Sequence, residues 1–236
     1  MTGNPHGDIT LRFAELLRDL ERTQPPDTDG ALRDLTVTAA EALPGTIAAG
    51  ITVIDRTGEV HSVASSDPVA EAVDAIQDRT KEGPCLTSAW EQHTVRMNDV
   101  AAETRWPDFC RWTLQDTPVR SAQSFQLFRN RDSMGALNFY GDRPHAFDDD
   151  SLELGLTLAT HTAIAWNLLM RDEQFRSALA SRDVIGQAKG VLMERYGIDA
   201  AAAFGLLRKL SQESNTPLAV LAERVVTTSG TGATDR

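Results

Sequence analysis

The sequence predicts an α+β chain, in which an antiparallel sheet flanked by helices is joined by a long helix to an all-helical unit of three helices. Three observations predict this class. Apolar residues recur at helical spacing near both ends, alternating apolar and polar runs fill the middle, and a helical pattern without proline connects the two parts. A length of 236 residues allows one large or two small domains.

The first part of the chain mixes helical and strand patterns. Residues 8–22 and 31–43 have helical spacing and are separated by the helix-breaking stretch TQPPDTDG. Residues 51–65 alternate and turn at Thr57 and Gly58, which predicts a β-hairpin. Apolar residues from Val69 onwards predict a further helix.

The middle of the chain is expected to be rich in loops. It contains the turn-prone segments EGPC (82–85) and RWPDFC (105–110), with one short strand in HTVRMNDV between them. Two strand-like runs follow, VRSAQSFQLF and MGALNFYG, joined by the polar turn RNRDS. We expect a sheet of about five or six mostly antiparallel strands.

A long helix is predicted from Asp148 onwards, and it has two apolar stripes. The first stripe is expected to pack on the sheet and consists of Leu152, Leu156, Ala159, Ala163, Trp166 and Met170. The second has heptad spacing and is expected to pair with the same helix of another subunit. It consists of Leu154, Leu158, His161, Ala165, Leu168, Asp172, Phe175 and Leu179. His161 is interpreted as fixing the register or lying at the rim, with a pH switch as the alternative.

The last part of the chain predicts a compact three-helix unit. Its first helix continues to Gly197, the second begins after the N-cap Asp199, and the third is introduced by Thr216 and Pro217. The second and third helices are expected to bury apolar residues: Ala203, Phe204, Leu207 and Leu210, then Leu218, Leu221, Ala222 and Val225. Residues 231–236 are predicted to be a disordered tail.

Charge is unevenly distributed along the chain. The formal net charge of −11 argues against indiscriminate binding of nucleic acid, which depends on clustered basic residues. Residues 165–236 hold 9 basic and 8 acidic side chains, whereas residues 1–164 have a net charge of −12. Any nucleic-acid surface is therefore expected in the C-terminal third.

The middle of the chain resembles the GAF domain of bacterial regulators, through EGPCLTSAW, RWPDFC, and VRSAQSFQLF leading into MGALNFYGDRPHAF in that order. The resemblance implies a sensory domain over residues 26–168, preceded by an N-terminal helix in residues 1–25 and followed by a coiled-coil linker helix at 169–181. It also implies a central antiparallel sheet with helices on both faces, and in some members a small molecule bound in a pocket.

Six residues are candidates for lining such a pocket: Trp90, His93, Trp106, Cys110, Phe125 and Phe139. Aromatic residues in a sheet of this kind are also consistent with a place in the core. No cofactor and no metal site is evident from the sequence.

Residues 182–230 resemble the ANTAR domain of bacterial transcription antiterminators, because the Ala-Lys-Gly run, the Ala-Phe pair, the LR..S segment and the LA..VV ending recur in order. The resemblance implies that the chain binds paired RNA hairpins as a homodimer and relieves transcription termination.

A helical wheel predicts which residues would form the RNA-binding surface. Arg182, Lys189 and Tyr196 form a row about 100° from the buried stripe, since successive residues rotate by that angle. Candidate RNA contacts on the second helix share one flank: Arg208, Ser211, Gln212 and Asn215. Gly190 leaves room for close approach. The alternative is an ordinary solvated face, in which Ser211 bonds to its own helix.

Two other functions remain open at this stage. A GAF-fold reductase of free methionine sulfoxide would use Cys85 and Cys110, the only cysteines, as nucleophile and resolving thiol. A helix-turn-helix DNA regulator would use the last helix, which is poor in base-reading side chains.

The chain has no apolar run of membrane-spanning length and no signal-peptide pattern, so a cytoplasmic protein with free thiols is expected.

Overall fold

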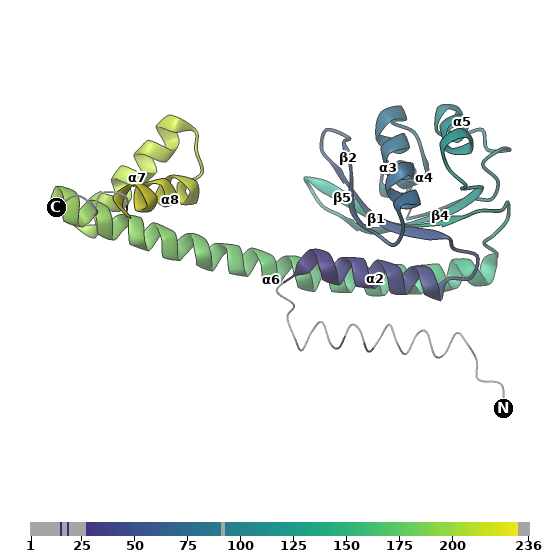
Figure 1. The fold of residues 1–236 in the computed structure, drawn as a ribbon, viewed down its shortest axis with the longest axis horizontal. Helices are drawn as coiled ribbons and strands as arrows, with labels where there is room; N and C mark the ends of the chain where they lie inside the picture. Colours follow the sequence, from purple (N-terminus) through teal and green to yellow (C-terminus); the bar gives the residue numbers. More distant parts are fainter. Residues whose placement is uncertain (1–14, 16–17, 19–26, 91–92, 231–236) are drawn as a thin grey trace. The chain divides into compact units, whose positions relative to one another are not determined.

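The computed structural model of the chain describes residues 15, 18, 27–90 and 93–230 (Figure 1). It divides into two compact units, Met1–Met170 and Arg171–Arg236, which we call the sheet unit and the three-helix unit. The predicted helix at 8–22 lies outside the described residues except for Glu15 and Arg18, which are helical, and the tail 231–236 lies outside them entirely.

The sheet unit contains a five-stranded sheet. Its strands are β1 (Ala48–Asp55), β2 (Val60–Ser65), β3 (Thr94–Met97), β4 (Ser121–Arg129) and β5 (Ser133–Gly141). They are arranged in the order β2-β1-β5-β4-β3, and every neighbouring pair is antiparallel. The predicted antiparallel sheet is confirmed.

Helices cover both faces of this sheet (Figure 1). The helices are α2 (Thr28–Ala42), α3 (Pro68–Thr80), α4 (Pro84–Trp90), α5 (Pro107–Asp116) and α6 (Asp149–Tyr196). Helices α2 and α6 lie on one face, where Leu35, Phe125 and Leu158 belong to one buried cluster. Helices α3, α4 and α5 lie on the other face, where Val73 and Phe109 belong to a second cluster. The sheet therefore separates two cores.

The prediction of a loop-rich segment over residues 82–110 is partly wrong: its short strand is confirmed as β3, but α4 and the start of α5 also lie there. Pro84 and Pro107 each stand at the first position of a helix, where the missing N–H is not needed. At the start of α5, the backbone N–H groups of Asp108 and Phe109 donate to Glu82 Oε2 over 2.9 and 3.2 Å. The cap of this helix comes from a distant part of the chain, so a local sequence pattern does not reveal it.

The two stripes predicted on α6 are also partly wrong. Leu158 and Ala165, which were assigned to the subunit interface, are 2% and 0% exposed and pack in the core of their own sheet unit. Leu156, which was assigned to the sheet, is 53% exposed. The buried row runs between the predicted stripes and includes Gly155 and Thr162, whose small or polar side chains conceal it from an apolar pattern.

The three-helix unit consists of the end of α6 with α7 (Ala200–Ser214) and α8 (Leu218–Gly230). Its buried cluster consists of Ala188, Leu192, Ala203, Leu207 and Ala222. Asp199 caps α7 as predicted, because its carboxylate accepts a hydrogen bond from Ala202 N at 2.8 Å. Phe204 and Leu210 were expected to be buried but are 40% and 39% exposed, which leaves apolar surface on α7.

None of the helices that the structure describes combines the length and the apolar character needed to cross a membrane.

Candidate functional site

The three-helix unit has a row of polar side chains beside its core. Lys189 is half-buried next to Ala188, while Arg182 and Tyr196 are exposed along the same flank of α6. Arg182 and Lys189 form no ion pair with any residue that the structure describes, and the same is true of Arg208 on α7. These three cations are therefore available to an external anion.

The residues predicted on α7 divide into two groups. Arg208 and Gln212 are exposed. Ser211 is half-buried, and its hydroxyl donates to the carbonyl oxygen of Thr216 at 2.6 Å. Asn215 ends α7 in a left-handed conformation with φ of 48°. Ser211 and Asn215 thus shape the turn between α7 and α8, whereas Arg208 and Gln212 are presented to solvent.

Three helical glycines of this unit are open to solvent. A methyl group added at Gly186, Gly190 or Gly205 would meet nothing within 4 Å. Glycine inside a helix costs about 1 kcal/mol relative to alanine. Because packing within the chain does not require these glycines, their positions are suited to close approach by another molecule.

Of the six residues predicted to line a pocket, the five whose side chains the structure describes do not come together in the sheet unit. Phe125 and Phe139 are fully buried on the α6 side, where their rings pack edge to face with 5.9 Å between the ring centroids. Trp106 and Cys110 are buried on the opposite side of the sheet. His93 is exposed and bonds through Nδ1 to Gln126 Oε1 at 2.8 Å, while the side chain of Trp90 lies outside the description. The five described side chains therefore do not line a single pocket.

The motifs EGPC and RWPDFC hold neighbouring helices together. Trp106 Nε1 donates to the hydroxyl of Thr87 in α4 at 3.2 Å, and the guanidinium of Arg105 lies 4.2 Å from the centre of the Trp106 ring. Together with Glu82 at the start of α5, these contacts give both motifs a structural role.

Sequence reasoning missed a buried chain of hydrogen-bonded side chains, which we call the polar chain. It consists of Ser88 in α4, Ser124 in β4, Asn138 in β5, Thr52 in β1, and Asp74 and Gln77 in α3. All six are at most 3% exposed. They are far apart in sequence, and each occupies a position that a local pattern assigns to the core, so only the fold reveals them as a group.

Hydrogen bonds in the polar chain point toward Asp74. Ser124 Oγ donates to Asn138 Oδ1 at 2.5 Å, Asn138 Nδ2 donates to Thr52 Oγ1 at 2.9 Å, and Thr52 Oγ1 lies 2.9 Å from both carboxyl oxygens of Asp74. Burial raises the pKa of Asp74 to about 7, against the hydrogen bonds from Thr52, Ser62 and Gln77. The polar chain thus ends at the Asp74 carboxyl group, whose pKa of about 7 makes it half protonated near neutral pH.

Neither cysteine is in an environment that favours a thiolate. Cys85 is fully buried, and burial together with the nearby Asp74 raises its pKa. The pKa of Cys110 is raised to about 11 by burial and by Glu103 and Glu82. A nucleophilic cysteine needs a lowered pKa, so these two thiols lack the expected activation.

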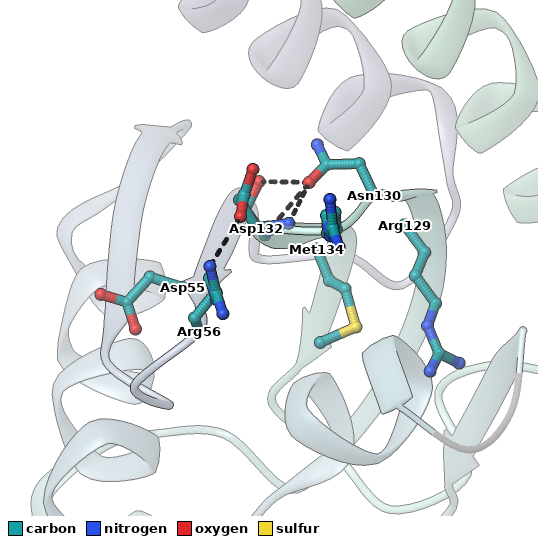
Figure 2. Close-up of a pocket in the computed structure, with 8 residues that line it drawn as sticks. Asp55, Arg56, Arg129, Asn130, Asp132 and Met134 are labelled. Atoms are coloured by element: carbon teal, nitrogen blue, oxygen red, sulfur yellow. Dashed lines mark hydrogen bonds and ion pairs between the residues drawn. The ribbon is translucent and has the colours of Figure 1, made fainter.

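A small pocket of about 150 Å³ lies between the tips of the two β-hairpins. Figure 2 shows the Arg56 guanidinium against the Asp132 carboxylate, 3.2 Å apart, while Asp55 and Arg129 point away from this pair. Asn130 Oδ1 accepts from the backbone N–H groups of Asp132 and Ser133 and so shapes the turn. Arg56 and Asp132 are both 70% exposed and neutralise each other, and we assign no ligand to this pocket.

Solved structures share the fold of the sheet unit. The chain is similar to a free methionine-R-sulfoxide reductase from Neisseria meningitidis, with 15% identity, 72% of this chain and 95% of that chain covered, and a TM-score of 0.54. It is also similar to the GAF domain of an Acinetobacter phosphoenolpyruvate-protein phosphotransferase, with 14% identity, 75% and 99% covered, and a TM-score of 0.54. At these identities the likeness shows the fold alone.

Family models match most of the chain. A GAF domain model matches residues 26–167, and an ANTAR domain model matches residues 173–226. No curated protein matches the sequence. Since the first model covers more than half of the chain, this chain belongs to the GAF domain family and also carries an ANTAR domain.

Proposed function

We propose that this chain is a transcription antitermination regulator, in which the ANTAR domain binds RNA hairpins and the GAF domain controls that binding in response to a signal. The presence of the two domains supports a sensor-regulated RNA-binding protein in general. The observation that carries the proposal is a group of three cations, Arg182, Lys189 and Arg208, which form no ion pair with the described residues in a chain of net charge −11.

Each residue of this surface has a distinct part in the proposed interface. Lys189 is half-buried and therefore restricted, so its ammonium suits a fixed phosphate contact. Arg208 can bind phosphate and base edges, Gln212 can read an unpaired base, and Tyr196, which is 61% exposed, can stack on one. Ser211 and Asn215 support the interface indirectly by fixing the turn after α7.

The proposed RNA-binding form is a homodimer joined through α6. After removal of the buried Leu158 and Ala165 from the predicted seam, the exposed Leu168, Phe175 and Leu179 remain, and Ile164, which is in neither predicted stripe, extends this exposed apolar row. Ile164, Leu168, Phe175 and Leu179 are 51%, 40%, 66% and 45% exposed. Their steps of four and seven residues are those of a coiled-coil seam. Leu154 and His161 are half-buried beside this row, at its rim.

The two alternatives have less support. A reductase would need a reactive thiolate, whereas the pKa values of Cys85 and Cys110 are both raised. A DNA-reading last helix would need several side chains that bind base edges, but the described exposed residues of α8 include Val220 and Glu223, with Arg224 as the one cation among them.

A binding experiment with matched variants tests the proposal. Fluorescence anisotropy of the full-length chain is measured with a tandem RNA hairpin, a single hairpin and duplex DNA. We expect preference for the tandem hairpin, and a loss of about tenfold or more for Lys189→Ala and Arg208→Ala. Lys209→Ala is the control, because Lys209 lies beside Arg208 but its ammonium is 3.8 Å from Glu213. Equal losses for all three variants would indicate a nonspecific effect of charge, and preference for duplex DNA would contradict the proposal.

A further inference from the structure

We propose that Asp74 is a proton-binding site and that proton uptake there is the signal which the GAF domain reads. This inference rests on the proposed function, since it names the signal that would control RNA binding. The polar chain, on which the site depends, joins strands β1, β4 and β5 to helices α3 and α4 on one side of the sheet.

The Asp74 carboxyl is buried without a cationic partner among the described residues. It is 3% exposed, and the donors around it are neutral: the hydroxyl of Thr52 at 2.9 Å from both oxygens, and Nε2 of Gln77 at 3.3 Å. Burial of a carboxyl group without a compensating positive charge favours the protonated, neutral form of that group. The carboxyl pKa of about 7 agrees with this geometry.

Titratable groups around Asp74 come from several elements, and none of those that the structure describes supplies a positive charge to it. Glu71 on α3 is a like charge that raises the pKa of Asp74 further. Cys85 on α4 and Tyr140 on β5 are buried, and both have raised pKa values, so both are neutral when Asp74 titrates. His61 on β2 faces Asp55 instead, with its Nε2 atom 3.7 Å from a carboxyl oxygen of that residue.

A short path connects this buried carboxyl to solvent. Ser62 of β2 is exposed, and its hydroxyl lies close enough to Asp74 to lower the pKa of that carboxyl. Ser62 pairs with Thr52 across the β1–β2 ladder, directly after an irregularity between Ile51 and Thr52. A local bulge of this kind re-aims side chains and so allows residues of both strands to reach Asp74. Protons can therefore exchange without opening of the core.

The two protonation states require different hydrogen bonding in the polar chain. An ionised Asp74 only accepts, so the Thr52 hydroxyl donates to it and accepts from Asn138. A protonated Asp74 becomes a donor, and if it donates to Thr52, the Thr52 hydroxyl must turn its own proton elsewhere. Thr52 then accepts from Asp74 as well as from Asn138, and this second donor perturbs the bonds that link Thr52 to Asn138 in the central strand β5 and to Ser124 in the neighbouring strand β4.

These strands also carry the residues that contact α6. Phe125 follows Ser124 in β4, and Phe139 follows Asn138 in β5, so their side chains point to the opposite face. Phe125 and Phe139 are buried under α6, and the Phe125 ring lies directly against Gly155 of that helix. A rearrangement at Ser124 can thus shift α6, which presents the exposed Ile164 and Leu168 further along.

Two measurements on the full-length chain test this proposal. The side-chain carboxyl carbon of Asp74, assigned by the loss of its NMR signal in Asp74→Asn, is followed across a pH titration. Affinity for a tandem RNA hairpin is measured by anisotropy at about pH 6 and about pH 8. Two controls are used: Asp34→Asn, an exposed aspartate on α2, and His61→Gln, which removes the histidine beside Asp55.

We expect Asp74 to titrate near pH 7 and the wild-type affinity to change by about fivefold or more between the two pH values. Asp74→Asn, which mimics the protonated state, should have the same affinity at both, while both control variants respond as the wild type. If Asp74→Asn does not fold, Glu71→Gln provides the second variant. It should lower the pH midpoints of the carboxyl titration and of the affinity change together.

The outcomes separate this proposal from the proposed function. Titration of Asp74 at its usual value of 3.8 would overturn the proton site. Titration near neutrality with a pH-independent RNA affinity would overturn its role as the signal. A lack of RNA binding at every pH would contradict the proposed function, and the carboxyl titration would still decide whether Asp74 binds a proton at neutral pH.

Discussion

Gly155 of α6 lies so close to Phe125 of β4 that a methyl group at position 155 would be 2.5 Å from the Phe125 Cζ atom. The Phe125 ring is fully buried and is fixed by an edge-to-face contact with Phe139, so it has little freedom to move away. This contact sets the distance between the helix and the sheet.

Replacement of Gly155 by alanine should therefore destabilise the chain, because the added methyl group overpacks the core. We expect a loss of about 1–3 kcal/mol in the free energy of unfolding, measured by urea denaturation. Gly186→Ala, in the same helix, is the control. A methyl group there meets nothing within 4 Å, so this change should stabilise the helix by up to about 1 kcal/mol. Equal effects of the two substitutions would contradict the packing described here.

Asp74 should make the stability of the chain fall as the pH rises. Its folded-state pKa of about 7 lies above its usual value of 3.8, so between these values the folded state holds a proton that the unfolded state has released. Stability is therefore lost as the pH rises toward 7, by on the order of 3–4 kcal/mol at most. Urea denaturation from about pH 4 to about pH 8 should show a steeper decline for the wild type than for Asp74→Asn. Parallel curves would show that Asp74 ionises in the same range when folded and unfolded.

Periodicity in the sequence predicts those elements whose stabilising contacts are local or repetitive. The antiparallel sheet and the N-cap at Asp199 are of this kind, since alternation and a single capping side chain are visible in a few residues. Helix α5 is not, because its N-terminus is capped by Glu82 from another segment. The buried row of α6 is hidden for a different reason: Gly155 is required there by close approach to Phe125, and glycine gives no apolar signal.

The candidate sites also differ in whether a local sequence pattern predicts them. Lys189 and Arg208 could be placed on a surface from the wheel alone, because they lie beside apolar helical stripes. Four of the residues proposed for a sensory pocket, Phe125, Phe139, Trp106 and Cys110, divide between the two faces of the sheet, because composition does not reveal which face a side chain occupies. The polar chain around Asp74 depends on contacts between residues up to 86 positions apart, such as Asn138 and Thr52.

Charged substitutions in the exposed row of α6 should dissociate the proposed dimer. Leu168→Glu combined with Phe175→Glu places two carboxylates in the apolar seam, and we expect the sedimenting mass to fall to that of one chain. Leu156→Glu is the control, because Leu156 is 53% exposed on the same helix but lies outside the row. A dimer that persists after the double substitution would show that subunits do not associate through this row.

The salt dependence of RNA affinity should distinguish phosphate contacts from base contacts. Each contact between a basic residue and a phosphate releases counterions, so Lys189→Ala should reduce the slope of log affinity against log salt by about one. It should weaken binding to hairpins of different loop sequence equally. Gln212→Ala should leave the slope unchanged and reduce discrimination between loops, because a neutral amide releases no counterion and reads base edges.

The proposed dimer adds a second test of the same surface, because two linked ANTAR domains would bind two linked hairpins at a high effective concentration. The double substitution Leu168→Glu and Phe175→Glu should therefore weaken binding to a tandem hairpin far more than binding to a single one. Lys189→Ala should weaken both, since it removes a contact from each domain. Anisotropy with single and tandem hairpins across a salt series measures all of these effects. An unchanged salt slope in Lys189→Ala would place the phosphate contacts on another face of the three-helix unit.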